Sequence, residues 1–132
     1  IYLDPIKNQY IEEAGAANFF ALMDDNSLVT PPLGTILPGI TRDSVIQLAK
    51  KIYHMKVEER DLGVEEVITH ARECFVTGTA AIITSVSDIG WQGKIHHINR
   101  NNYQLAHQFY EKLINIQLQK DDDPFNWVRA VQ

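Results

Sequence analysis

A ten-residue stretch crowded with proline and glycine constrains this chain more than any other feature. From Thr30 to Gly39 the sequence reads TPPLGTILPG. Each proline fixes φ and lacks a backbone N–H, so a regular helix or a central strand is excluded here. The stretch therefore predicts a loop with a defined path, and apolar periodicity begins soon after it.

Three apolar stripes at the i, i+3, i+4 spacing predict three helices. They cover residues 45–52, 64–71 and 106–116. In the first, Arg42, Asp43, Gln47 and Lys50 fall largely off the apolar stripe, which predicts that they face away from the core.

Strand-like runs occupy much of the remaining chain. They lie at residues 1–4, 10–22, 74–77, 80–86 and 89–98, with a polar turn at 24–27 and a glycine bend at 78–79. Strands interleaved with helices predict one α/β or α+β domain across residues 1–132. The chain opens on an apparent strand already in progress, so we expect a domain truncated at its start, with Ile1 to Asp4 near a sheet edge.

Composition excludes several classes of partner. The formal net charge of -5 is spread over the chain, which argues against nucleic acid. No apolar run approaches the roughly 20 residues that span a bilayer, so no membrane partner is expected. The lone Cys74 favours a buried thiol and a reducing, cytoplasmic setting. His96 and His97 are adjacent and lack further ligands at metal spacing, so no metal site is predicted.

The segment LPGITRD delivers the proline-rich loop into a helix start. The first turn of a helix leaves N–H groups without partners and carries a partial positive charge, so it is a natural phosphate seat. Gly39 would let the backbone approach closely. The alternative is a plain turn with Thr41 as the N-cap.

Two further segments could carry chemistry. In FVTGTAA, a glycine bend could aim N–H groups at an anion, with a hydroxyl from Thr77 or Thr79, although small residues at a bend also serve packing. In EEAGAAN, Glu12 and Glu13 enter an apolar strand. A buried carboxylate needs a positive partner, and strand alternation lets at most one of the two be buried. The alternative is that Glu12 and Glu13 are both turn residues that face solvent.

These segments, in this order, resemble the branched-chain amino acid aminotransferases of pyridoxal-phosphate fold type IV. The matching stretches are YIEEAGAANFF, LVTPPLGTILPGITRDSVIQLAK and ECFVTGTAAIITSV, with weaker similarity as far as Trp127. The resemblance covers essentially the whole chain. It implies the carboxy-terminal large domain of the D-amino acid aminotransferase-like fold, a mixed sheet or pseudo-barrel with flanking helices.

The resemblance also implies roles for individual residues around pyridoxal 5'-phosphate. Glu13 would pair with the ring nitrogen and Leu37 would pack on a face of the ring. The N–H groups of Ile40 and Thr41 would hold the phosphate. Thr79 and Ala80 would bind the substrate carboxylate, and the Thr79 hydroxyl would also reach the phosphate. These anchors should face one cavity.

Two departures from the family pattern stand out. The family's cofactor-binding lysine and phosphate-binding arginine precede the strand with which this chain opens, and no lysine here matches that motif. We therefore expect no catalytic residue within residues 1–132 and no activity from them alone. The Cys-x-x-Cys of mammalian relatives reads Ala81 to Thr84 here, so no redox switch is expected there.

The function implied by the resemblance is transfer of an amino group between leucine, isoleucine or valine and 2-oxoglutarate, by a homodimeric full-length enzyme. D-amino acid aminotransferase and aminodeoxychorismate lyase share a similar cofactor cup, but TPPL and GTILPGITRDS favour the branched-chain group. From another class, a non-catalytic domain that binds a phosphate-bearing ligand or a partner chain also stays open.

Overall fold

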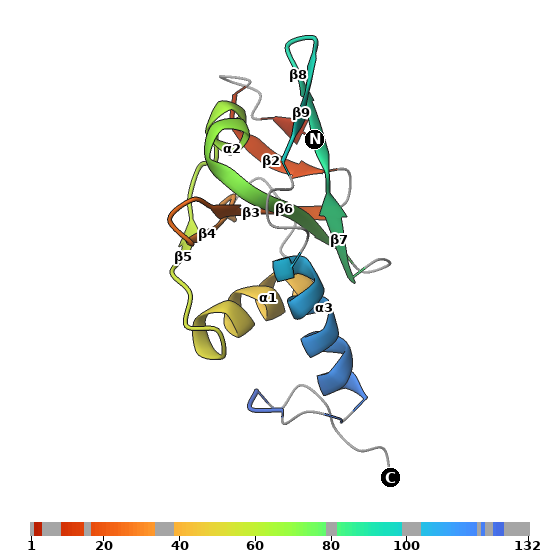
Figure 1. Cartoon of the computed structure of the whole chain (residues 1–132). Helices are drawn as coiled ribbons and strands as arrows, with labels where there is room; N and C mark the ends of the chain where they lie inside the picture. Colours follow the sequence, from red (N-terminus) through yellow and green to blue (C-terminus); the bar gives the residue numbers. More distant parts are fainter. Residues whose placement is uncertain are drawn as a thin grey trace.

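A computed structural model of the chain describes residues 2–3, 9–14, 17–33, 39–78, 82–98, 104–118, 120 and 123–125 (Figure 1). Only the backbone is described for Tyr2, Leu3, Glu13, Ala14 and Ile82. Strands and helices alternate along the chain. The elements are β1 (Tyr2–Leu3), β2 (Ile11–Ala14), β3 (Ala17–Met23), β4 (Leu28–Thr30), α1 (Ile40–Lys51), β5 (Val57–Glu59), α2 (Val64–His70), β6 (Ala71–Gly78), β7 (Ile82–Val86), β8 (Asp88–Trp91), β9 (Lys94–His97) and α3 (Gln104–Gln117).

A seven-stranded mixed sheet organises the molecule around β3. The strand β6 pairs antiparallel with β3 from Asn18 to Met23. The opposite edge of β3 is shared by β2 near its start and β4 near its end. The crossover through α1 returns the chain to β5, which pairs parallel with β4, and β7 pairs with β6. The strands β8 and β9 form a separate hairpin.

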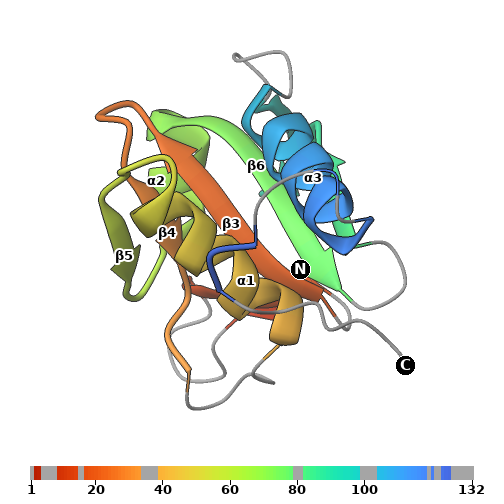
Figure 2. The same ribbon diagram turned by 90° about the horizontal axis from the view of Figure 1, so that it is seen from below.

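Each face of the sheet buries its own apolar core, because successive side chains of a strand project to opposite faces. On one face, α1 and α3 lie side by side across β3 and β6 (Figure 2). There Phe20 stacks on Phe75 at 5.1 Å between ring centroids, and Phe109 of α3 meets Phe75 edge-on at 5.9 Å. On the other face, α2 covers Phe19, Cys74 and their neighbours.

The predicted mixed sheet with flanking helices is confirmed, and so are the three helices. The second stripe was expected to run through Ala71, but α2 ends at His70 because Ala71 is already extended and opens β6. The strand-like run 10–22 is two strands that turn between the paired Ala14 and Ala17. The residues Tyr2 and Leu3 form the terminal strand in the sheet order, as expected, whereas Ile1 and Asp4 lie outside the described residues.

One side chain of the first helix departs from the prediction. Arg42 was expected to face away from the core, yet only 3% of its surface is exposed. Helical periodicity sorts apolar from polar positions but does not reveal a buried polar partner, and Arg42 has partners in Pro31 and Glu59.

Within the described ranges, no helix is long and apolar enough to cross a membrane. The same ranges contain no group of three or more His, Cys, Asp or Glu side chains that could hold a metal ion.

Candidate functional site

The start of α1 presents its first backbone N–H groups without a side-chain cap. Gly39 is the N-cap residue in an extended conformation, and it makes no side-chain cap hydrogen bond. The first intrahelical donor is Asp43, whose N–H bonds the Gly39 carbonyl at 3.1 Å. Thr41 is therefore the second helical residue and not the N-cap. The N–H groups of Ile40 and Thr41 stand in the turn that attracts anions.

A close approach between backbone and sheet fixes this helix start. A Cβ placed on Gly39 would lie 2.3 Å from Oδ1 of Asn18, far inside any contact that real side chains show. Asn18 is itself buried, near the start of β3. The absence of a side chain at Gly39 thus lets α1 begin directly on β3. The expected close approach of the Gly39 backbone to a phosphate stays a prediction.

The register of the sheet sets a row of residues beside this contact. Glu13 of β2 pairs with Asn18, Asn18 pairs with Thr77 of β6, and Thr77 pairs with Ile83 of β7. Asn18 stands two residues before Phe20 in β3, and Thr77 stands two residues after Phe75 in β6. Both phenylalanines belong to the core beneath α1 and α3. Because residues two apart in a strand share a face, Asn18 and Thr77 lie on the α1 side of the sheet.

Thr77 has an unsatisfied buried hydroxyl in this row. The residue is 1% exposed, and its Oγ1 has no hydrogen-bond partner among the residues that the structure describes. A buried polar group without a partner costs stability, so such a group often marks a position that a bound ligand completes. The hydroxyl, the uncapped helix start and the close approach at Gly39 fit a ligand that carries an anionic, hydrogen-bonding group.

The predicted site residues divide into two sets. Ile40 and Thr41 open α1, as expected, with Ile40 88% exposed and Thr41 half-buried. Glu13 occupies the register position opposite Asn18, next to that helix start. Leu37, Thr79 and Ala80 lie outside the described residues, although β6 ends at Gly78, immediately before them. Convergence of all these anchors in one cavity thus stays a prediction.

Sequence reasoning missed two residues of this region. Asn18 ends the motif EEAGAAN, but only the register reveals that it joins Glu13, Thr77 and Gly39. Arg42 reads as an ordinary surface residue of a helix until its burial is known. A polar residue between apolar neighbours, as in AANFF, was the available signal for Asn18.

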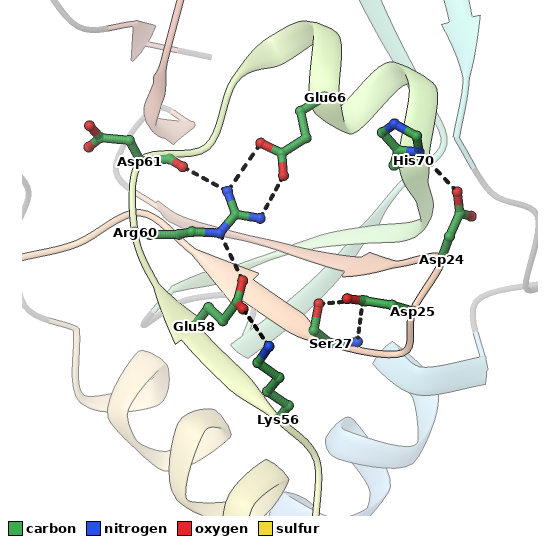
Figure 3. Close-up of polar contacts among 9 residues, drawn as sticks. All are labelled: Asp24, Asp25, Ser27, Lys56, Glu58, Arg60, Asp61, Glu66 and His70. Atoms are coloured by element: carbon green, nitrogen blue, oxygen red, sulfur yellow. Dashed lines mark hydrogen bonds and ion pairs between the residues drawn. The ribbon is translucent and has the colours of Figure 1, made fainter.

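A second polar cluster lies on the α2 side of the sheet (Figure 3). Arg60 pairs with Glu58 at 2.8 Å and with Glu66 at 2.6 Å, and both carboxylates raise the pKa of the guanidinium. Lys56 also pairs with Glu58, at 3.0 Å, and the two cations lower the pKa of that carboxyl. These partners neutralise one another, so the cluster joins β5 to α2 without presenting a free charge.

The cavities near α2 are remote from the helix start. A cavity of about 520 Å³ is lined by Gln9, Tyr10, Gly63, Val64, Glu65, Trp91 and Gln92. Its walls come from α2 and the β8–β9 turn, across the sheet from α1. We therefore place the candidate site at the start of α1, where geometry and the unpartnered hydroxyl coincide.

The fold is that of an α/β domain, and its candidate site lies at a helix start. Comparison with known proteins gives the family. The sequence profile of amino-transferase class IV matches residues 5–89, and the chain belongs to this family.

The three relatives described here are all named as branched-chain amino acid aminotransferases. A branched-chain-amino-acid aminotransferase from Helicobacter pylori is 38% identical over 131 residues, 99% of this chain and 38% of that protein. Branched-chain-amino-acid aminotransferase 2 of Bacillus subtilis is 38% identical over 138 residues, with the same coverage. Among solved structures, the branched-chain amino acid aminotransferase from Escherichia coli aligns with a TM-score of 0.80 at 32% identity, over 96% of this chain and 41% of that chain. The chain thus spans about 38% of the length of these sequence relatives.

Proposed function

We propose that this chain is the cofactor-holding part of an enzyme that transfers an amino group between leucine, isoleucine or valine and 2-oxoglutarate. The cofactor would be pyridoxal 5'-phosphate. The observation that supports this most is the juxtaposition of the uncapped start of α1 with the row Glu13, Asn18 and Thr77. That helix start lies in the middle stretch, which resembles the branched-chain enzymes most specifically, and the row lies in the other two matching stretches.

The resemblance to the branched-chain enzymes gives each anchor its role, and the chemistry of the residue supports it. The N–H groups of Ile40 and Thr41 bind the phosphate through the helix start. The carboxylate of Glu13 holds a proton on the ring nitrogen, Leu37 packs on a face of the ring, and Thr79 with Ala80 binds the substrate carboxylate. When bound, the cofactor supplies the electron sink for removal of the substrate proton.

The setting of the whole enzyme is part of the same proposal. Its substrates are branched-chain amino acids and 2-oxo acids, it acts as a homodimer in amino acid biosynthesis, and it is cytoplasmic. The single, buried Cys74 agrees with a reducing compartment. The alternatives within the fold, D-amino acid aminotransferase and aminodeoxychorismate lyase, have no support among the similar proteins reported above.

Replacing Glu13 by Gln in the complete gene product tests the assignment. A neutral amide cannot keep the ring nitrogen protonated as an ion pair does, and this loss affects the transition state more than cofactor binding. We expect pyridoxal phosphate to bind with nearly unchanged affinity while turnover of leucine with 2-oxoglutarate falls at least about a hundredfold. Wild-type turnover in the variant would overturn the role of Glu13.

A substrate panel tests the choice of reaction. Purified wild-type protein should transaminate leucine, isoleucine and valine in preference to D-alanine. Preference for the D-amino acid, or release of pyruvate from aminodeoxychorismate, would reject the branched-chain assignment while keeping the family.

A further inference from the structure

Arg42 occupies a position that is costly for a cation. It lies in the first turn of α1, where the helix dipole disfavours positive charge, and only 4% of its side chain is exposed. Burial of a charge is unfavourable without close partners. A side chain kept there must make contacts that offset both costs.

The contacts of Arg42 join the two ends of the proline-rich loop. Its Nη2 donates to the carbonyl of Pro31 at 3.0 Å and to Oε1 of Glu59 at 2.9 Å. Pro31 opens the loop and Gly39 closes it, three residues before Arg42. One nitrogen therefore ties the beginning of the loop to the helix that follows its end.

Glu59 holds the guanidinium in place from a third element. It is the last residue of β5 and pairs with Thr30, the last residue of β4. The N–H of Arg60 bonds the Thr30 carbonyl at 3.1 Å, which fixes the strand end from which the loop departs. The side chain of Glu59 is 41% exposed, so the carboxylate of the ion pair contacts solvent while the guanidinium is buried.

We propose that Arg42, held by Glu59, is a positioning residue that ties Pro31 to the first turn of α1 and thereby sets the geometry of the phosphate seat. This inference rests on the proposed function, because the seat at Ile40 and Thr41 is the site that it deepens. Without the guanidinium, the Pro31 carbonyl loses a buried donor. The first turn of α1 then loses its tie to Pro31, and the seat at Ile40 and Thr41 shifts.

The test compares affinities of the complete gene product, freed of cofactor, for pyridoxal phosphate and for pyridoxal, by fluorescence titration. A loss of general stability weakens both ligands, whereas a displaced phosphate seat weakens only the first. For Arg42→Met we expect the preference for the phosphorylated ligand to fall about tenfold, which corresponds to about 1.4 kcal/mol. Arg42→Lys should recover part of this preference, because one nitrogen makes both bonds.

The matched control is Arg60→Gln. Arg60 follows Glu59 in the chain and makes more ion pairs than Arg42, but toward α2 (Figure 3). This variant should lose stability and keep the wild-type preference for the phosphorylated ligand.

Each outcome bears on the proposal. If Arg42→Met weakens both ligands equally, the residue is only structural and the proposal is overturned. If that variant does not fold, Glu59→Gln decides the question: a reduced preference supports the proposal and an unchanged one rejects it. A wild-type protein without any preference for the phosphorylated ligand would overturn both this inference and the proposed function, whereas a preference unaffected by Arg42→Met overturns this inference alone.

Discussion

At the scale of single residues, Gly39 and Gly63 make an informative pair. Both are helix N-cap residues in extended backbone conformations that any residue adopts, with φ of -84° and -72°. They differ in what a side chain would meet. A Cβ at Gly39 would overlap Asn18 Oδ1 at 2.3 Å, whereas at Gly63 the nearest atom is Cβ of Glu66 at 3.8 Å. The two glycines therefore differ in the space that a side chain would have, and not in backbone conformation.

Alanine at these two positions should act differently. We expect Gly39→Ala to lower the free energy of unfolding by about 1–3 kcal/mol, because buried Asn18 has little room to move. Gly63→Ala should stay within about 0.5 kcal/mol of wild type. Urea unfolding of both variants followed by circular dichroism measures the difference, and equal losses would contradict the steric argument.

Cys74 should be inert in the folded protein. Burial, and secondly the neighbouring carboxylate of Glu73, raise the pKa of its thiol well above the ordinary value. The reactive thiolate is then scarce at neutral and mildly alkaline pH. We expect Ellman's reagent at pH 8 to label Cys74 rapidly in urea and only at the rate of unfolding in buffer. Fast labelling of the native protein would show that the thiol is accessible.

At the scale of elements, the attachment of α3 depends on a buried carboxylate from another element. Glu73 of β6 is fully buried, and it accepts hydrogen bonds from the N–H of Leu105 at 3.0 Å and of Ala106 at 2.8 Å. A carboxylate at a helix start offsets the partial positive charge of the dipole. Glu73 thus caps α3 from a residue 32 positions earlier in the chain.

Loss of this cap should release α3. In Glu73→Gln one oxygen is replaced by an NH₂ group that cannot accept a hydrogen bond, so one buried N–H loses its partner. We expect the free energy of unfolding to fall by about 1–3 kcal/mol. Glu111→Gln, which removes an exposed carboxylate paired with His107 on the same helix, is the control and should change stability by under about 0.5 kcal/mol. Similar losses in both variants would argue against capping by Glu73.

At the scale of the whole molecule, the sheet ends and several exposed apolar residues point to association. Among the described strands, β1, β5 and β7 are the end strands of the branched sheet. Ile40, Ile95 and Leu118 are 88%, 72% and 59% exposed. Strand edges with unpaired N–H and C=O groups and exposed apolar side chains promote contacts between chains.

We therefore expect residues 1–132, expressed by themselves, to self-associate. Light scattering across a range of concentrations should show a mass that rises above the 15.1 kDa of one chain. A constant monomeric mass at the highest concentration would contradict this expectation. The same sample should show no transamination with added pyridoxal phosphate, and turnover together with a borohydride-stable adduct on one lysine would reject that second expectation.

Much of the fold was predictable because its signals are local. The stripes of Val45, Leu48 and Val67 placed α1 and α2, and the apolar run around Phe75 placed β6. A helix start at Ile40 and Thr41 followed from the proline-rich loop and was confirmed, because α1 begins at Ile40. The phosphate-binding role of these two residues stays a prediction. By contrast, Thr41 was a plausible N-cap by residue type, and only the geometry showed that Gly39 takes that place.

The sequence by itself determined that three helices form and which stretches resemble a family, since periodicity, glycine and proline act through neighbours in the chain. The tertiary structure alone decided that Asn18 meets Gly39, that Thr77 lies buried beside Asn18 without a partner, and that Arg42 is buried. These contacts join residues from 11 to 59 positions apart by strand register and helix packing. No local pattern encodes such pairs, because the energy of each contact depends on a partner that only folding brings close.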